Sequence, residues 1–323
     1  MGRLGQGPRL AFMKLAICGL LLWAHVAYAG LEKYSALVVA DAKPGAPAPS
    51  DAIRVTYLGV NGFQLENGNH ALLVDPYFSR IGLGAVVFNQ SIEANPNRVG
   101  DGLRHTSTSV EAILVTHAHF DHLLDVPFIM RRTQARLLAG PTAVNLVESF
   151  GIRPNQCEVV EPGTVRLIGP WTIRVLGATH DRLIGKSPPF PGTITTPMKR
   201  PIKASDWKLG EPLAFVVEAA GKRIYVDSGG LPGAAPDPVV GSIDLAILGV
   251  ALPDSRRRFA ETVRRLRPRY ILPSHQDDFF VPFSRGFVFG KLTNFPEILR
   301  EQEKDHLPGH LILLDYFRPW TLR

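Results

Sequence analysis

The sequence is poor in cysteine and in clustered charge. Only two of its 323 residues are cysteines, Cys18 and Cys157, which is too few for a disulfide framework or a cysteine-rich zinc module. Any bound metal must therefore be held by histidine and carboxylate side chains. The basic residues form no run interleaved with aromatics, apart from short arginine clusters at 256–258 and 264–265 that are typical of a solvated helix face. We therefore expect no nucleic-acid partner.

Low-complexity sequence and short internal repeats are also absent. The 27 prolines and 30 glycines are spread along the chain, which excludes a collagen-like or largely disordered protein. Hydrophobic residues make up 45% of the sequence and charged residues 20%. This balance is typical of a globular protein with a sizeable core.

The N-terminal segment has the composition of an export signal. Residues 10–29 are nearly all apolar, follow a few basic residues and end in Ala27-Tyr28-Ala29, the small-residue pattern that signal peptidase recognises. We predict a signal peptide over residues 1–29 that is cleaved near Ala29, and a periplasmic or secreted mature protein. The alternative is an uncleaved membrane anchor over residues 10–29, which has about the length that spans a bilayer. That anchor would be the only expected contact with a membrane.

Both Met1 and Met13 are possible start residues, because the apolar run from Leu15 to Val26, preceded by Lys14, is already signal-like without the residues before Met13. Cleavage would remove Cys18 and leave Cys157 as the only thiol of the mature chain. An internal disulfide would then be impossible.

One folded domain is predicted over residues 52–323, after a linker at 30–51 that contains proline and alanine. Short β-branched runs bounded by glycine, proline or polar residues predict strands, at 53–58, 63–66, 71–74, 113–115, 173–176, 214–217, 223–226, 245–248 and 270–272. Periodic segments predict helices at 122–132, 141–150, 255–267 and 294–304. Strands precede helices in each half of the chain. This order predicts an α+β fold in which two similar halves bring their sheets face to face, with helices outside.

Two long segments show no convincing periodicity. Residues 77–110 are rich in glycine, and residues 181–212 carry six prolines and several basic side chains, among them Lys199 and Arg200. Segments of this length in a compact domain are usually binding or lid elements. The alternative is a pair of surface insertions without a role.

The strongest functional signal is a histidine-rich motif directly after the predicted strand at 113–115. Its candidate metal ligands are His117, His119, Asp121 and His122. A neutral imidazole offers one lone pair to a metal such as Zn²⁺. The alternating His117 and His119 can point two ring nitrogens into one cavity beyond the strand end, and Asp121 and His122 can serve a second position. The motif therefore predicts a metal centre.

Three further ligand-type residues follow other predicted strands. They are His180, Asp227 and His275, and each lies at the C-terminal end of its strand. Taken singly, such a histidine is more often a satisfied polar residue, and an aspartate before Ser-Gly is usually a turn former. Their shared placement and their order along the chain favour membership of the same centre.

These residues give the chain a resemblance to the metallo-β-lactamase-fold hydrolases. The resemblance covers residues from about 52 to 316 and implies a four-layer αββα sandwich with a dinuclear site on one rim of the sheets. It implies that one metal is held by His117, His119 and His180, that the other is held by Asp121, His122 and His275, and that Asp227 bridges them. The segment Asp75-Pro76-Tyr77-Phe78 also resembles the subgroup of ascorbate-lactonase-like and N-acyl-phosphatidylethanolamine phospholipase-like enzymes.

The arrangement implied by the resemblance predicts hydrolysis without a protein nucleophile. Two divalent ions, which we expect to be zinc with manganese or iron as alternatives, activate a shared water and stabilise the developing oxyanion. Asp121 is the expected catalytic residue, because it can take the proton of that water. Asp277 and Asp278 follow His275 closely, and we expect them to orient it or to protonate the leaving group. The alternative for these two is an acidic turn or a helix N-terminus.

The substrate is expected to carry an ester-type bond, as a carboxylic ester, a lactone or a phosphodiester, in a small or lipid-like molecule. The loop with Lys199 and Arg200 would attract an anionic group. The aromatic stretch at 279–289 predicts either a wall for an acyl group or part of the core. Two other classes are an iron-dependent redox enzyme on the same fold and a non-catalytic metal-binding protein. The second would be expected to have lost ligands, whereas all seven positions are filled.

Overall fold

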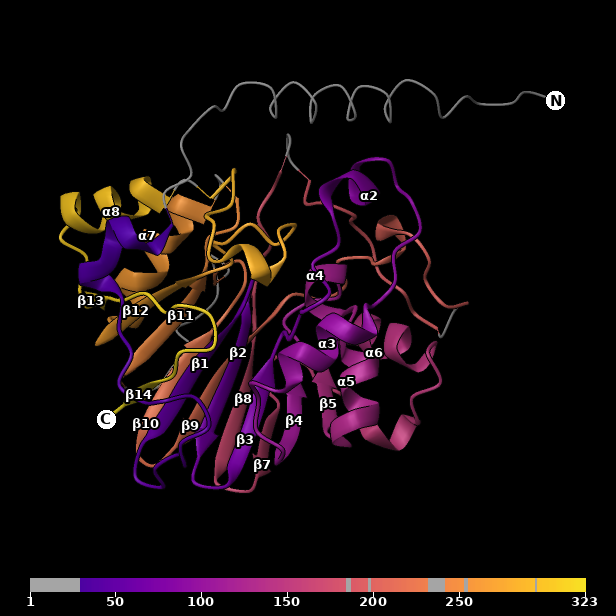
Figure 1. The fold of residues 1–323 in the computed structure, drawn as a ribbon, viewed down its shortest axis with the longest axis horizontal. Coiled ribbons are helices and arrows are strands. Elements are labelled where there is room, and N and C mark those ends of the chain that lie inside the picture. Colours follow the sequence, from indigo (N-terminus) through magenta and orange to yellow (C-terminus); the bar gives the residue numbers. More distant parts are fainter. Residues whose placement is uncertain (1–29, 184–186, 197–198, 232–241, 253–254, 294) are drawn as a thin grey trace.

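The computed structural model describes residues 30–183, 187–196, 199–231, 242–252, 255–293 and 295–323. The predicted signal peptide, including the alternative anchor at 10–29, lies outside these residues. Within the described part of the chain, no helix has the length and apolar character needed to cross a membrane. Two seven-stranded sheets form the centre of the fold (Figure 1).

The first sheet combines strands from the N-terminal half with one strand from the C-terminus, in the order β14-β1-β2-β3-β4-β5-β6. The pairs β14-β1, β1-β2 and β2-β3 are antiparallel, whereas β3 to β6 run parallel. The strands are β1 (Ile53–Gly59), β2 (Gly62–Asn67), β3 (His70–Val74), β4 (Val110–Leu114), β5 (Arg136–Ala139), β6 (Cys157–Val159) and β14 (Trp320–Leu322).

The second sheet repeats this plan in the order β13-β12-β11-β10-β9-β8-β7. Its strands β7 to β10 are antiparallel and β10 to β13 are parallel. The strands are β7 (Val165–Ile168), β8 (Trp171–Gly177), β9 (Leu213–Ala219), β10 (Lys222–Val226), β11 (Leu245–Gly249), β12 (Tyr270–Ser274) and β13 (His310–Leu311). The two similar halves predicted from the order of elements are therefore present.

The helices lie outside the two sheets (Figure 1). Beside the first sheet are α2 (Leu83–Val87), α3 (Pro96–Leu103), α4 (Phe120–Leu123), α5 (Val126–Thr133) and α6 (Pro141–Glu148), and beside the second are α7 (Ser255–Leu266) and α8 (Phe295–Lys304). Short 3₁₀ segments are η1 (Leu31–Leu37), η2 (Pro154–Gln156), η3 (Ala204–Asp206) and η4 (Phe283–Arg285).

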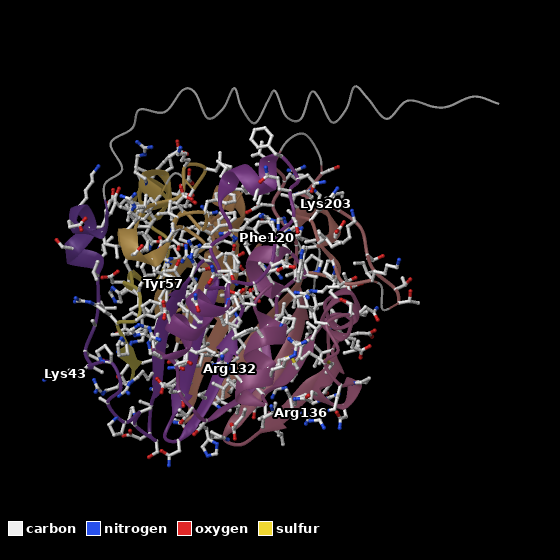
Figure 2. All side chains as sticks on the ribbon, turned by 45° about the vertical axis from the view of Figure 1, so that its right-hand side comes forward. Lys43, Tyr57, Phe120, Arg132, Arg136 and Lys203 are labelled. Carbon is white, nitrogen blue, oxygen red and sulfur yellow. The ribbon has the colours of Figure 1, made fainter. Side chains whose placement is uncertain are left out.

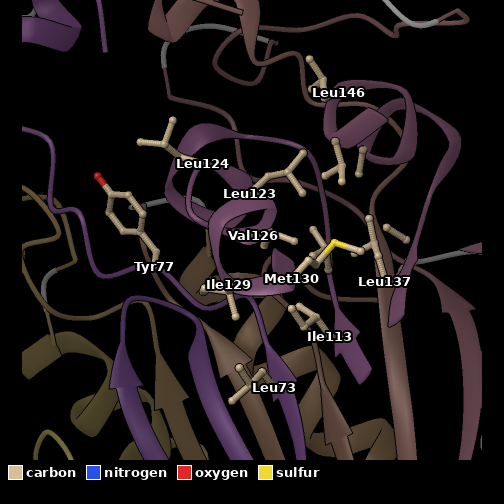
Figure 3. Close-up of a cluster of buried hydrophobic side chains, with 14 of the residues drawn as sticks. Leu73, Tyr77, Ile113, Leu123, Leu124, Val126, Ile129, Met130, Leu137 and Leu146 are labelled. Atoms are coloured by element: carbon tan, nitrogen blue, oxygen red, sulfur yellow. The ribbon is translucent and has the colours of Figure 1, made fainter. Parts of the chain in front are cut away.

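Three clusters of buried apolar side chains fill the spaces between four layers. Successive strand residues point to opposite faces of a sheet, so Leu72 and Phe215 meet between the sheets. Their neighbours point outward: Leu73 packs with Met130 under the helices of the first sheet (Figure 3), and Val216 packs under α7 and α8. Each such side chain contributes about 1.5–3 kcal/mol to the free energy of folding when it is fully buried. The predicted four-layer αββα sandwich is confirmed.

Most predicted elements are found, and the differences have local causes. The helix predicted at 122–132 is divided into α4 and α5, because Pro127 lacks a backbone N–H and therefore lies in the first turn of a new helix. The segment 77–110, predicted to lack regular structure, contains α2 and α3. Asn95 caps α3 by accepting a hydrogen bond from the backbone N–H of Arg98 at 3.0 Å.

The segment predicted as a linker, residues 30–51, packs against the domain. The backbone N–H of Val39 donates to the carbonyl of Leu313 at 2.9 Å. The ring centroids of Tyr34 and Phe295 are 4.9 Å apart. Arg54 of β1 donates to the backbone carbonyl of Pro47 at 2.7 Å. These contacts replace the extended, separate linker that the proline and alanine content indicated.

Candidate metal centre

The predicted ligands gather where several strands end at one edge of the two sheets. The chain leaves β4 after Leu114, passes through His117 and His119, and enters α4 at Phe120, so that Asp121 and His122 lie in the first turn of that helix. Phe120 marks this end of the sheets in Figure 2. His180 follows β8 and His275 follows β12. The ends of these strands thus bring together residues that are far apart in sequence.

Six of the seven predicted ligands form two groups of three. In each group the potential ligand atoms lie within 4.8 Å of one another, and the groups are His117, His119, His180 and Asp121, His122, His275. The two groups adjoin, because the ring centroids of His117 and His122 are 3.9 Å apart. Neutral imidazole and carboxylate are the ligands expected of a zinc-type centre.

Burial keeps the histidines of the first group in the form that binds metal. Burial, and then the neighbouring imidazoles, hold the pKa values of His117 and His119 well below the ordinary range. The same causes, with burial the larger, lower the pKa of His180 to about 3. These three rings are therefore neutral at physiological pH and have a lone pair available.

In the second group, Asp121 is held as a carboxylate. Burial alone would raise its pKa, but the charge of His122 and the hydrogen bond from His275 outweigh burial and hold that pKa below the ordinary value. Its Oδ2 lies 3.0 Å from Nε2 of His275 and 3.7 Å from Nε2 of His122. An anionic carboxylate between two imidazoles suits a divalent cation.

Asp75, at the end of β3, orients His122. Its Oδ2 lies 2.8 Å from Nδ1 of His122, and its carboxylate also accepts hydrogen bonds from the backbone and hydroxyl of Thr116 and from Nδ2 of Asn61. Within the described structure, the buried Nε2 of His122 has no hydrogen-bond partner. A ring held at one nitrogen by a carboxylate, with its other nitrogen buried and available, is the usual arrangement of a metal-binding histidine. These residues therefore fit a metal ion.

A cavity of about 80 Å³ opens over both groups. Its polar floor includes His119, Asp121, His180 and His275, and its walls are formed mainly by Phe120, Pro189, Phe190, Ala251 and Leu252, with Asp181 and Ser228. The part of the wall that comes from the segment 181–212 contacts a predicted metal-ligating side chain. The backbone carbonyl of Pro189 lies 3.0 Å from Nε2 of His119. The segment therefore lies beside the candidate site, and its role in binding stays a prediction.

Asp227 belongs to neither of the two groups. Its carboxylate accepts hydrogen bonds from the hydroxyl of Tyr225 at 2.8 Å and from the backbone N–H of Gly249 at 3.3 Å. Asp227 directly follows β10, and its partner Tyr225 packs in the cluster under α7 and α8. Its predicted role as a bridge between two metals remains a prediction.

The two acidic residues after His275 have different surroundings. Asp277 is fully buried and forms an ion pair with Arg80 at 2.7 Å. Asp278 accepts a hydrogen bond from the backbone N–H of Phe280, and burial raises its pKa. Among the described residues, neither lines the cavity, so their contacts give no support to a role as leaving-group acid.

The predicted substrate residues of the basic loop lie on the outer surface. Lys199 and Arg200 are exposed, and the guanidinium of Arg200 lies over the ring of Phe150 at 4.9 Å. The phenylalanines of the stretch 279–289 are half-buried and pack against the edges of the hydrophobic clusters. Phe279 packs partly buried against the first-sheet cluster, with its ring centroid 5.2 Å from that of His275.

The functional residues that sequence reasoning missed are Asp75, as the partner of His122, and Arg80, as the partner of Asp277. Asp75 has a recognisable signal, because it ends a buried strand just before Pro76. Arg80 has a weaker one, because it is the only charged residue between 76 and 92.

Comparisons with known proteins agree with this geometry. The family model described as the beta-lactamase superfamily domain matches residues 70–275. A relative from Rubrobacter xylanophilus, named as a UPF0173 metal-dependent hydrolase, is 29% identical over 240 residues, which is 72% of this chain and 84% of the relative.

Two solved structures share the fold. Igni18, described as a metallo hydrolase from Ignicoccus hospitalis, has a TM-score of 0.55 at 17% identity, covering 84% of this chain and 99% of that one. CmlA, described as a diiron β-hydroxylase from Streptomyces venezuelae, has a TM-score of 0.53 at 14% identity, covering 86% of this chain and 55% of that one. At these identities, the likeness concerns the fold alone.

Proposed function

This chain belongs to the beta-lactamase superfamily, and on that premise we propose that it is a metal-dependent hydrolase that holds two divalent ions and cleaves an ester-type bond. The observation that carries the proposal is the pair of adjoining ligand groups under one cavity. A non-catalytic binding protein would have no need for two complete groups beside an accessible space. A relative that covers most of the chain is itself named a metal-dependent hydrolase.

The first ion would be held by His117, His119 and His180, and the second by Asp121, His122 and His275. Bound there, divalent ions would supply a water that is nucleophilic at neutral pH and Lewis-acid stabilisation of an oxyanion. Zinc suits the five imidazoles and one carboxylate of these groups. Manganese or iron are the alternatives that metal analysis separates.

The chain itself supplies orientation, proton transfer and exclusion of water. Asp75 fixes the ring of His122 through Nδ1, so that Nε2 faces the site. Asp121 is anionic and buried in the cavity floor, so its carboxylate can accept the proton of the attacking water. Phe120 and Phe190 in the wall keep bulk water from the reacting bond.

The shape and chemistry of the cavity support an apolar group next to the scissile bond. Phe190 and Leu252 offer apolar contact on one side of the ligands, which suits an acyl chain or a hydrophobic leaving group. The cavity of about 80 Å³ admits the reacting centre and its nearest atoms. We therefore favour a carboxylic ester, a lactone or a phosphodiester of a small or lipid-like molecule over a lactam.

The test is a panel of chromogenic substrates assayed with zinc or manganese restored. Carboxylic esters, lactones, phosphodiesters and β-lactams are compared at equal concentration, with the His119→Ala variant as the blank. Turnover of at least one ester class is expected. Turnover of β-lactams alone would overturn the proposed bond type, and iron-dependent oxidation without hydrolysis would overturn the reaction class.

Charge steering by the basic loop has a separate test. If the substrate is anionic, Lys199→Ala combined with Arg200→Ala is expected to slow its capture about tenfold at low salt and less at high salt. A loss that does not depend on ionic strength would contradict steering. An uncharged ester provides the matched control, since its turnover is expected to be unchanged.

A further inference from the structure

Arg80 and Asp277 form a charged pair inside the protein. The side chains of both are 0% exposed, and Nη2 of Arg80 lies 2.7 Å from Oδ2 of Asp277. Two charges removed from water gain little net stability from each other, since desolvation offsets their attraction. Such a pair therefore indicates that a particular arrangement of the chain is being held.

The surroundings fix this pair from every side. Asp277 accepts hydrogen bonds from the hydroxyl of Tyr57 at 2.8 Å, from the hydroxyl of Tyr316 at 2.6 Å and from the backbone N–H of Val60 at 2.9 Å. The guanidinium of Arg80 lies over the ring of Phe283, 4.1 Å from its centroid. Among the described residues, neither member of the pair lines the cavity.

Gly59 makes this close approach possible. A Cβ at this position would lie 1.9 Å from Nη2 of Arg80, and the backbone of Gly59 has φ +89°, a conformation that favours glycine. The end of β1 is thus shaped around the guanidinium.

Asp277 is linked through the backbone of Val60 to His275, a ligand of the second metal group. His275 lies two residues before Asp277, has φ +55°, and donates its backbone N–H to the carbonyl of Val60 at 2.6 Å. The N–H of Val60 is in turn bonded to Asp277. Asp277 therefore holds the turn that presents His275.

Arg80 belongs to the segment that orients His122, the other histidine of the same group. Arg80 ends the segment that begins at Asp75, and Asp75 holds Nδ1 of His122. The backbone is left-handed at both Asp75 and Arg80, with φ +39° and +48°. Non-glycine residues adopt this conformation only where their surroundings impose it. The ion pair therefore joins the segment that orients His122 to the turn that presents His275.

We propose that Arg80 is a positioning residue for the second metal group: through Asp277 it fixes the relative placement of His122 and His275. This inference rests on the proposed function for the existence of two metal positions. Among the described residues, no hydrogen bond joins the pair directly to a ligand of either group. Asp277 is linked to His275 through Val60 alone, whereas the first group is linked by a longer route, through Asp75 and the hydroxyl of Thr116, which lies 3.2 Å from Nδ1 of His117. We therefore expect Arg80 to act mainly on the second metal position.

The experiment measures the two metal affinities separately. The full chain is freed of metal with a chelator and titrated with Co²⁺ alone, and the visible absorption bands report the occupancy of each position. The variants His180→Ala and His275→Ala assign the two binding steps. The variants compared are Arg80→Met and Arg80→Lys, with Arg54→Met as the control. Arg54, at the start of β1, is also buried, but its guanidinium donates to the backbone carbonyl of Pro47.

Arg80→Met is expected to weaken the His275-dependent step by about 10–100-fold, as outer partners of metal ligands do, and to change the other step by less than about twofold. Arg80→Lys keeps the charge without the planar fork, and a smaller loss at the same step is expected. Arg54→Met should change neither step, although it lowers the unfolding temperature.

The inference is overturned if Arg80→Met weakens both steps by the same factor, which is the signature of general destabilisation, or weakens neither. Gly59→Ala crowds the guanidinium and keeps its charge, so it gives the same comparison if Arg80→Met does not fold. A wild-type chain that binds fewer than two Co²⁺ ions would overturn the proposed function as well. Two bound ions with no selective effect of Arg80 would overturn this inference alone.

Discussion

The substitution Asp75→Asn separates the charge of the Asp75 side chain from its shape. In the native protein the carboxylate accepts four hydrogen bonds, two from Thr116, one from Asn61 and one from His122. An amide keeps one acceptor oxygen and replaces the other with an NH₂ donor. The bond from the backbone of Thr116 can be kept, and the hydroxyl of Thr116 can turn to accept. The amide NH₂ then faces Asn61 and His122.

The consequence for His122 is a change of tautomer. Its Nδ1 must accept a hydrogen bond from the new NH₂ group, which places the ring proton on Nε2, the atom that would bind metal. Metal binding then has to displace that proton or break the new bond. Loss of such an orienting carboxylate weakens metal affinity by about 10–100-fold. One or two buried donors also lose their acceptor, at about 1–3 kcal/mol each, so the metal-free protein is expected to be less stable by about 2–4 kcal/mol.

Two assays check this prediction. Competition with a chromogenic chelator gives the zinc affinities, and urea unfolding in the presence of a chelator gives the stability of the metal-free chain. Asp244→Asn is the matched control, because Asp244 accepts a backbone hydrogen bond from Arg223 at the opposite end of β10 and β11. If Asp75→Asn keeps both zinc affinities of the wild type, the reasoning about His122 is refuted.

Three further predictions concern other parts of the chain. His119→Ala should lose metal and hydrolytic activity together, as measured by elemental analysis and turnover of the same sample; activity retained without metal would contradict a metal-dependent mechanism. In a chain freed of Cys18 by substitution, alkylation of Cys157 at pH 8 should be slow, because burial, and then the charge of Glu148, raise the pKa of this thiol to about 12; a rate equal to that of free cysteine would contradict its burial. N-terminal sequencing of protein from the native host should find a mature end near Gly30, whereas an intact N-terminus in the membrane fraction would favour the anchor.

The sequence is most informative where chemistry and periodicity coincide. His117, His119, Asp121 and His122 are dense enough in sequence to identify a metal centre, and His180 and His275 follow from their shared position at strand ends. The core strands are predictable because β-branched residues recur between turn-forming residues. Short strands are not: β5, with the sequence Arg-Leu-Leu-Ala, has no β-branched residue and forms because its neighbours in the sheet offer backbone partners.

Tertiary contacts decide what the sequence leaves open. Asp227 follows a strand as His180 does, but its carboxylate accepts a hydrogen bond from the hydroxyl of Tyr225, a contact that only the folded chain shows. Asp277 lies close to His275 in sequence and suggested proton transfer. Its partner Arg80 is almost 200 residues away, and only the folded chain shows that Asp277 is held in an ion pair.

The central claim is that two adjoining groups of three side chains each hold one metal ion. The most direct measurement is a crystal structure of the zinc-loaded protein with anomalous diffraction data collected on both sides of the zinc absorption edge. The account predicts two anomalous peaks, one in contact with His117, His119 and His180 and one in contact with Asp121, His122 and His275. A single peak, or peaks that leave either group without a metal, would contradict it.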